Sequence, residues 1–370
     1  MARGATNALG LDVGGEAIKA VQLQKTRGGL RVVGRPAAIP TPRGAVAGGV
    51  IVDGGAVSAA LTDMVAEHGL NCKEVVASVG GSTSVTVRVV SMPRMSGREL
   101  REAMDYELDR QVPFPIDQVI YDYQVIETPE GEAGDEMNVF LAAAQEDMIN
   151  AHVETIMGAR LRPIHIDVEA LALSRALVNV SPNGRNRQTV ALAQIGASQT
   201  EISIVRDGYL EFVRAIPTAG ETLTHAVRQE LIHDDGQAEQ AKRQFADVRE
   251  LSGGPQAGES AEVHAARQSV QGAISEPLFE LVTELGRTVD FYRRQRPGHD
   301  IHAIILSGGS AVIPGLAEFV QGETGVPTEV ANPYEYLLHD AGSLDEAYLR
   351  DLGPITAVAV GLAMRDMLSD

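Results

Sequence analysis

The sequence predicts a mixed α/β protein built from two related halves, because apolar strands that run into glycine turns occur three times. The first occurrence is Leu9–Leu23, where apolar residues alternate with small or polar ones on both sides of a Gly-Gly pair. Such alternation is typical of β-strands, and glycine readily adopts the positive φ of a tight turn. A similar strand–glycine–strand unit begins 182 residues later, in Ala191–Val205, and a third glycine turn follows Ile301–Leu306. A unit repeated at half the chain length indicates two related domains.

Helical and strand-like spacing alternate between these units. Apolar residues at i, i+3 and i+4 predict helices, and Ser96 with Glu99 forms a capping box, which is typical of a helix start. The polar segment Ser181–Gln188 contains turn residues and predicts a major boundary, and Leu251–Ser260 predicts a loop. We expect helices at 57–69, 96–112, 148–159, 168–179, mostly over 221–294 and at 355–364, and strands at 75–79, 84–90, 120–127, 138–143 and 163–167.

The composition limits the classes of function. The chain has 370 residues with 31 basic and 50 acidic side chains, which gives a formal net charge of −19. Nucleic acids and anionic lipids attract clustered Lys and Arg, so this charge argues against both ligands. The single cysteine, Cys72, excludes an internal disulfide, and no apolar run approaches the ~20 residues of a membrane span. We expect an acidic, soluble, cytosolic protein that does not bind nucleic acid and does not insert directly into a membrane.

The glycine turns predict phosphate binding. A turn rich in glycine presents backbone N–H groups with little side-chain bulk in the way, and such nests bind anions. Asp12 precedes the first turn, where it could hold Mg²⁺ through water or simply accept bonds from turn amides. Lys19 follows in the next strand, where it could reach a polyphosphate or extend to solvent.

A second candidate cluster lies on a predicted helix. Glu239 and Lys242 are three residues apart and therefore share one helix face. They could form a solvated ion pair, or they could contact the ribose hydroxyls and the base of a nucleotide. The histidines show no zinc-ligand spacing, and Cys72 has no neighbouring base that would activate it.

Together these segments resemble the actin-like ATPase superfamily. LDVGGEAIKAV resembles its first phosphate loop, LAQIGASQTEISI its second, IILSGGSAVIPGL its adenosine loop, and AEQAK the AExxK helix of FtsA-like members. Within the superfamily the chain is most similar to the PilM family of type IV pilus assembly proteins. This similarity covers nearly the whole chain. Its most specific parts are Met92–Tyr123 with its VPFPID run, Ile166–Leu173 and Ile313–Glu335.

The resemblance implies an actin-like α/β fold, in which two related halves surround a nucleotide cleft and an FtsA/PilM-type subdomain is inserted. It implies that residues 1–92 and 162–188 form the first half, and that 93–161 form the inserted subdomain. Residues 189–218 and 286–350 would form the second half, with a helical nucleotide-side subdomain at 219–285. Residues 351–370 would form a C-terminal helix that returns to the first half.

The resemblance also implies ATP and Mg²⁺ as ligands. Asp12 would hold the metal through water, and Glu169 is a candidate for orienting the attacking water. The second phosphate loop usually begins with Asp, but here it begins with Gln194, a neutral residue that disfavours strong Mg²⁺ binding and efficient hydrolysis. The implied ATP-binding residues are Asp12, Gly14, Gly15, Lys19, Gly196, Ala197, Ser198, Gly220, Glu239, Lys242, Gly308, Gly309 and Ser310.

The implied function is that of an ATP-binding scaffold in the inner-membrane platform of the type IV pilus. Its partners would be the cytoplasmic tail of a PilN-like membrane protein and other platform proteins. We expect the tail to bind beside the inserted subdomain at Met92, Met95, Met104 and Phe114, although these residues could also be core. The alternatives are an active ATPase or kinase of the same fold, an FtsA-like division protein and a type II secretion platform protein. We expect ATP hydrolysis to be slow or absent.

Overall fold

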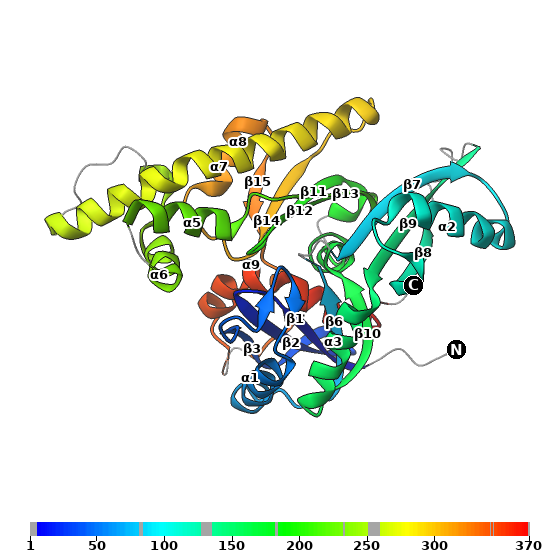
Figure 1. Ribbon diagram of the computed structural model, residues 1–370, viewed down its shortest axis with the longest axis horizontal. Helices are drawn as coiled ribbons and strands as arrows, with labels where there is room; N and C mark the ends of the chain where they lie inside the picture. The colour runs from blue at the N-terminus through cyan, green and yellow to red at the C-terminus, as the bar shows by residue number, and fades with distance from the viewer. Residues whose placement is uncertain are drawn as a thin grey trace. The chain divides into compact units, whose positions relative to one another are not determined.

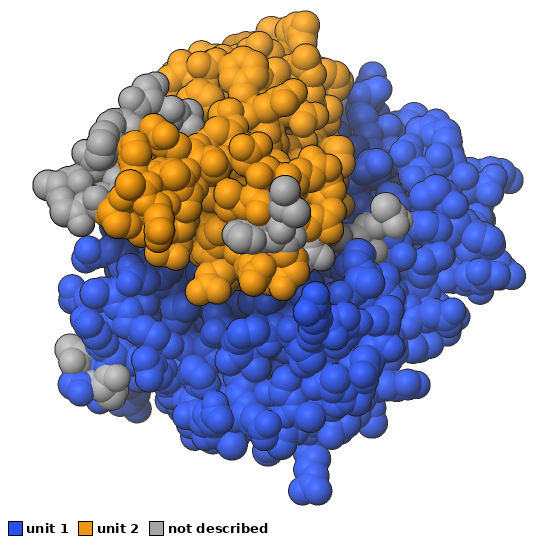
Figure 2. Space-filling model, turned by 60° about the vertical axis from the view of Figure 1, so that its left-hand side comes forward, with its two compact units in different colours: residues 1–188, 203–213, 332–370 blue, residues 189–202, 214–331 orange. Residues whose placement is uncertain are grey.

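A computed structural model describes residues 6–80, 84–126, 135–181, 184–231, 234–250, 260–340, 342 and 344–368 (Figure 1). The chain forms two compact units. Unit 1 comprises residues 1–188, 203–213 and 332–370, and unit 2 comprises 189–202 and 214–331 (Figure 2). The division into five segments that the resemblance implies stays a prediction. The predicted loop at 251–260 lies outside the described residues, apart from Ser260, which caps a helix.

Unit 1 contains a five-stranded sheet in the order β10-β6-β1-β2-β3. Strand β1 runs antiparallel to β2 and parallel to β6, and Asp12 on β1 lies opposite Lys19 on β2. The predicted hairpin at 9–23 is therefore confirmed. The strands are β1 (Asn7–Val13), β2 (Ala17–Thr26), β3 (Gly29–Pro40), β6 (Glu74–Val79) and β10 (Arg162–Val168), with a small pair β4 (Val46–Ala47) and β5 (Val50–Ile51).

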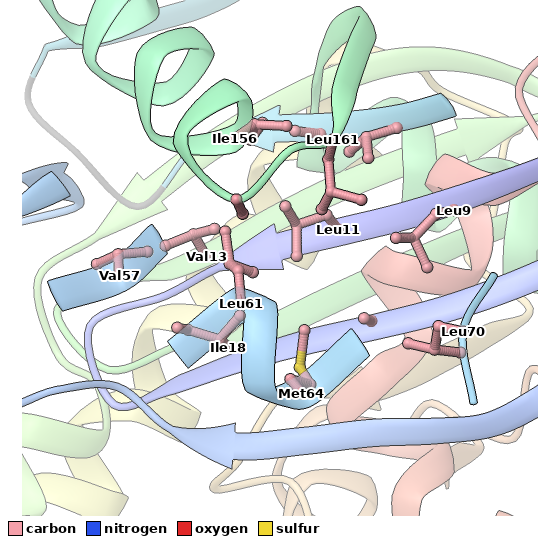
Figure 3. Packing of buried hydrophobic residues seen from close by; sticks show 14 of the residues in the cluster. Leu9, Leu11, Val13, Ile18, Val57, Leu61, Met64, Leu70, Ile156 and Leu161 are labelled. Atoms are coloured by element: carbon pink, nitrogen blue, oxygen red, sulfur yellow. The ribbon is translucent and has the colours of Figure 1, made fainter. Parts of the chain in front are cut away.

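Helices cover this sheet and enclose its core. In Figure 3 the side chains of Leu11 and Val13 on β1 lie among those of Val57, Leu61 and Ile156, which come from α1 and α3. The packing fixes β1, which carries Asp12 near its end. The helices of unit 1 that pack on the sheet or beside it are α1 (Gly54–Glu67), α3 (Glu146–Gly158), α4 (Glu169–Ser174) and α9 (Glu346–Ala363).

Helix α9 approaches strand β1 and helix α4 very closely. A Cβ on Gly10 of β1 would lie 1.9 Å from the Ala359 carbonyl oxygen, and one on Gly361 would lie 1.8 Å from that of Ala172. Real Cβ atoms do not make contacts this short, so both sites require glycine. The buried helix predicted at 355–364 is confirmed. Within the part of the chain described, no helix has both the length and the apolar character needed to cross a bilayer.

A smaller sheet in unit 1 is covered by one helix. Strands β7 (Val85–Pro93), β9 (Glu136–Gln145) and β8 (Val119–Ile126) pair antiparallel in that order, and α2 (Gly97–Gln111) packs on them. The predicted capping box is present, since Ser96 N–H donates to Glu99 Oε2 (2.8 Å) and Glu99 N–H to Ser96 Oγ (3.5 Å). Leu100, Met104 and Leu108 of α2 are buried against this sheet.

The second large sheet has the order β13-β12-β11-β14-β15. Strands β11 and β14 are parallel, with Gln194 opposite Ser307. The helix-rich stretch predicted over 221–294 is confirmed, and its longest member, α7, is the extended helix in Figure 1. The elements are β11 (Thr189–Ile195), β12 (Thr200–Arg206), β13 (Tyr209–Ile216), α5 (Gly220–Leu231), α6 (Asp235–Phe245), α7 (Ala261–Gln295), β14 (Ala303–Ser307), α8 (Leu316–Thr324) and β15 (Thr328–Val330).

Candidate functional site

The first glycine turn carries a buried ion pair. Asp12 is 4% exposed, and its Oδ2 lies 3.1 Å from Lys19 Nζ on the opposite strand. Gly14 N–H donates to the Ala17 carbonyl oxygen (3.0 Å) and closes the turn, which also contains Gly15. A Cβ on Gly14 would lie 2.7 Å from Lys19 Nζ, so glycine leaves room for the ammonium group over the turn. The lysine therefore does not extend freely to solvent.

Two residues near this turn were missed by sequence reasoning. Thr41 Oγ–H donates to the Gly14 carbonyl oxygen (2.7 Å) and so fixes the turn from β3's side. His152 on α3 is buried, with Nδ1 2.9 Å from the Met148 carbonyl oxygen. Burial lowers the pKa of His152, whereas the Met148 carbonyl and the charge of Asp12 act in the opposite direction. The sequence could have indicated the burial of His152, since a histidine on an apolar helix face is a candidate for burial.

The second glycine turn packs on the start of a helix. Gly196 N–H donates to the Gln199 carbonyl oxygen (3.1 Å) and closes this turn, as the bond from Gly14 to Ala17 closes the first. The carbonyl oxygens of Gly196 and Ala197 accept bonds from the N–H groups of Gly220 (3.0 Å) and Glu221 (2.8 Å) at the start of α5. Ser198 is half-buried in the same turn. The structure thus joins the predicted Gly220 to the second glycine turn.

Gln194 is hydrogen-bonded to the residue that precedes the third glycine turn. Its buried side chain accepts a hydrogen bond at Oε1 from Ser307 Oγ–H (2.6 Å), immediately before Gly308. Gly308 has φ +93°, and a Cβ there would lie 2.2 Å from the Ile195 carbonyl oxygen, so this position requires glycine. Gly309 follows it, and Ser310 is buried, with Oγ 3.1 Å from a Cβ built on Gly220.

Helix α6 contributes a buried polar cluster. Lys242 Nζ donates to the Gly220 carbonyl oxygen (3.1 Å) and to Thr224 Oγ (2.8 Å), and it lies 2.6 Å from Glu239 Oε2. Arg243 Nε–H donates to Glu239 Oε1 (2.7 Å). Burial raises the pKa of Glu239, but Lys242 and the hydrogen bonds outweigh it and hold the pKa below its ordinary value. Because Lys242 is only 7% exposed, the two residues form a buried ion pair and not a solvated one.

Thr224 is the residue that sequence reasoning missed in this cluster. Its Oγ–H donates to Glu239 Oε2 (2.6 Å), and its oxygen accepts a bond from Lys242. The i, i+4 spacing from Gly220 on α5 could have indicated that it lies on the same helix face. Through these contacts the predicted residues Gln194, Gly196, Ala197, Gly220, Glu239, Lys242, Gly308 and Ser310 form one connected cluster.

Glu169 lies at the first position of α4. A Cβ on Gly80 would lie 2.5 Å from Glu169 Oε1, so the carboxylate packs against the chain just after β6. The neighbouring Asp167 at the end of β10 forms ion pairs with Arg175 and with Arg365 (3.2 Å). These contacts fix the end of β10 from which α4 begins.

The residues proposed for peptide binding divide into two pairs. Met92 is 6% exposed and Met104 is fully buried, both in the core between α2 and its sheet. Met92 and Met104 are therefore core residues, the alternative that the sequence left open for them, and a bound peptide could not reach their side chains without opening this core. Met95 and Phe114 are half-buried and pack against the same core from its edge.

Comparison with known proteins identifies the family. The family model described as type IV pilus assembly protein PilM matches residues 10–250 and 258–367. The chain is similar to a solved PilM-PilN type IV pilus biogenesis complex, with 27% identity, 98% of this chain and 99% of that chain covered, and a TM-score of 0.83. It is also similar to the cell division protein FtsA of Streptococcus pneumoniae serotype 2, with 22% identity over 352 residues, 88% of this chain and 75% of that protein.

A more distant structure shows the fold alone. The ethanolamine utilization protein EutJ from Carboxydothermus hydrogenoformans is 14% identical, with 97% of this chain and 90% of that chain covered and a TM-score of 0.55. The predicted actin-like α/β class with two sheet-containing halves is confirmed. Since the family model spans nearly all of the sequence, the chain belongs to the family of the type IV pilus assembly protein PilM.

Proposed function

We propose that this protein is an ATP-binding scaffold of the inner-membrane platform of the type IV pilus, and that it binds the cytoplasmic tail of a PilN-like membrane protein. Its family assigns it a role in type IV pilus assembly. The observation that carries the proposal is the similarity over 98% of the chain to a PilM-PilN complex. The protein would then be peripheral to the inner membrane and attached through its partner. The five-segment division inferred from the resemblance is part of this proposal.

The nucleotide would be held by the glycine turns. The turn amides of Gly15, Ala197 and Ser198 suit phosphate oxygens, those of Gly14 and Gly196 close the two turns, and Lys19 adds a positive charge. Asp12 suits water-bound Mg²⁺, which would neutralise phosphate charge when bound. The space over Gly14 that a Cβ would fill supports this fit. The ribose and adenine would be surrounded by Gly220, Glu239, Lys242, Gly308, Gly309 and Ser310.

Slow or absent hydrolysis is the second part of the proposal. Phosphoryl transfer depends on a held metal and on positioned charge. Gln194 is neutral, and its side-chain oxygen Oε1 already accepts a hydrogen bond from Ser307 Oγ–H. Glu169 remains the candidate for orienting water. Gln194→Asp keeps an acceptor for Ser307 and adds the missing charge, so it should increase the Mg²⁺ dependence of ATP binding.

Two measurements test these proposals separately. Calorimetry with MgATP on the full chain should show stoichiometric binding, while phosphate release should stay well below an ordinary enzyme rate of about 1 s⁻¹. A pull-down with the PilN-like tail peptide tests the partner. Absence of ATP binding would overturn the nucleotide assignment, rapid phosphate release would make the protein an ATPase, and failure to retain the peptide would remove the partner.

A further inference from the structure

Glu201 occupies the position on the second hairpin that Lys19 occupies on the first. The bond from Gly14 N–H to the Ala17 carbonyl closes the first turn, and the register beyond it sets Asp12 opposite Lys19. The bond from Gly196 N–H to the Gln199 carbonyl closes the second turn between the adjacent strands β11 and β12. The same register, counted outward from this bond, sets Gln194 opposite Glu201. The second hairpin thus carries a carboxyl group where the first carries an ammonium group.

One oxygen of the Glu201 carboxyl group has no partner among the described residues. Its Oε1 is buried, and no hydrogen-bond donor of the described residues reaches it. A buried carboxylate without a donor or a cation is costly, whereas a protonated carboxyl is tolerated. Burial accordingly raises the pKa of Glu201 to about 7. At neutral pH this group therefore exists in both forms.

Several charged groups of the surrounding elements are bound to other partners. On β13, Arg214 is held by Glu284 (2.9 Å) and Thr288 (3.3 Å) of α7. At the far end of β12, Arg206 is bound to Glu211. Further charges lie on α5 and α6, where Glu221 begins α5, and Lys242 and Arg243 both bind Glu239. Across the sheet the neighbours Gln194 and Ser307 are neutral and bind each other.

We propose that Glu201 takes up a proton when the polyphosphate of a nucleotide occupies the turn Gly196–Ser198, so that the protein binds ATP more tightly as the pH falls from 8 to 6. This inference rests on the proposed nucleotide binding. A polyphosphate placed at this turn repels an ionised carboxylate on the adjoining strand, and the solvent supplies the proton that removes the repulsion. By linkage, a group that gains a proton on binding makes the affinity fall as the pH rises.

Calorimetry with the full chain tests this proposal. ATP at saturating Mg²⁺ is titrated at pH 6 and pH 8, in buffers of different ionisation enthalpy, so that proton uptake is measured directly. Wild type should take up part of a proton near neutral pH and bind roughly fivefold more tightly at pH 6. Glu201→Gln should lose this proton uptake, and its affinity for ATP at pH 8 should equal that of wild type at pH 6. Glu230→Gln, an exposed carboxyl on α5, is the matched control and should behave as wild type.

The variants separate the possible outcomes. The terminal phosphate of the nucleotide titrates equally with every variant, so only a difference between wild type and Glu201→Gln supports the proposal. Equal pH dependence of ATP binding in wild type and Glu201→Gln overturns the proposal. So does an outcome in which wild type takes up no proton and Glu201→Gln loses the Mg²⁺ dependence of binding, since Glu201 would then be a carboxylate for metal-bound water. Glu201→Lys, which copies the first hairpin, should bind with little pH dependence between pH 6 and 8 and serves if Glu201→Gln does not fold. If wild type does not bind ATP, the proposed function is overturned as well. If wild type binds ATP but takes up no proton through Glu201, this inference alone is overturned.

Discussion

Lys19 Nζ lies 3.1 Å from Asp12 Oδ2, and both side chains are largely shielded from solvent. The pair sits across the two strands that flank the first glycine turn, so each charge fixes the other at the place where phosphate and Mg²⁺ would bind. A charge that is paired and ordered before binding loses little entropy when a ligand arrives. If the proposed nucleotide site is right, the ion pair would therefore order the turn before the nucleotide binds.

Lys19→Ala should weaken ATP binding about tenfold to a hundredfold, because a charged hydrogen bond contributes about 1.5–3 kcal/mol. It should also destabilise the fold, since Asp12 is left buried without its cation. Calorimetry and urea unfolding measure the two effects. Lys19→Arg should retain most of the ATP affinity and most of the stability. Lys25→Ala, at an exposed position on the same strand, is the matched control. ATP affinity unchanged in Lys19→Ala would show that Lys19 only supports Asp12.

Thr224→Val should reduce ATP affinity about fivefold to thirtyfold. The hydroxyl joins Lys242 to Glu239, and Lys242 in turn holds the carbonyl oxygen of Gly220. A buried polar group that loses its partner costs about 1–2 kcal/mol, and the start of α5 loses its support. Calorimetry on Thr224→Val and Thr224→Ser checks this, because serine keeps the hydroxyl. Unchanged ATP affinity in Thr224→Val would contradict the role of the hydroxyl.

The strands and turns of the site were predictable, but its polar contacts were not. Local patterns determine the hairpin at Gly14 and the capping box at Ser96, so the sequence predicts both. The contact of Thr224 with Lys242 spans 18 residues and depends on how α5 packs against α6. Likewise, an apolar stripe shows that Met104 belongs to a helix face, but it does not show whether that face is covered.

Gly361→Ala should destabilise the protein by more than about 3 kcal/mol. A Cβ there would lie 1.8 Å from the backbone carbonyl oxygen of Ala172, and backbone cannot move aside as a flexible side chain can. Gly272→Ala is the control, since this exposed glycine of α7 has no atom within 4 Å of a Cβ. That variant should gain about 0.5–1 kcal/mol from helix propensity. Urea unfolding of both variants measures the contrast, and similar effects would contradict the close approach of α9.

His152 should make the protein less stable in mild acid. Burial lowers the pKa of His152 in the folded state below its unfolded value of about 6.5. The unfolded chain therefore binds the proton first as the pH falls, and the free energy of unfolding decreases below about pH 6.5. The slope of this free energy between pH 7 and 5 should be smaller in His152→Leu. The control is His225→Leu at an exposed position, and an unchanged slope in His152→Leu would assign the acid sensitivity elsewhere.

Phe114→Ala should weaken binding of the PilN-like tail while ATP affinity stays unchanged. Phe114 stands between Pro113 and Pro115, which restrict the chain, so little entropy is lost when this side chain is ordered against a peptide. It is half-buried at the edge of the α2 core, where a partner can reach it. The buried Met104 is unsuitable for the test, because Met104→Glu would place a charge in that core.

Binding of the tail peptide can be measured by titration with a labelled peptide, and urea unfolding of each variant confirms that it folds. Met95→Glu should act as Phe114→Ala does, since Met95 packs at the same edge. Tyr106→Ala is the matched control, because this aromatic residue is 81% exposed on the outer side of α2. Loss of about 1 kcal/mol or more at Phe114 and Met95, with none at Tyr106, would locate the peptide at this edge. Full retention by Phe114→Ala and Met95→Glu would place the tail on another surface of the protein.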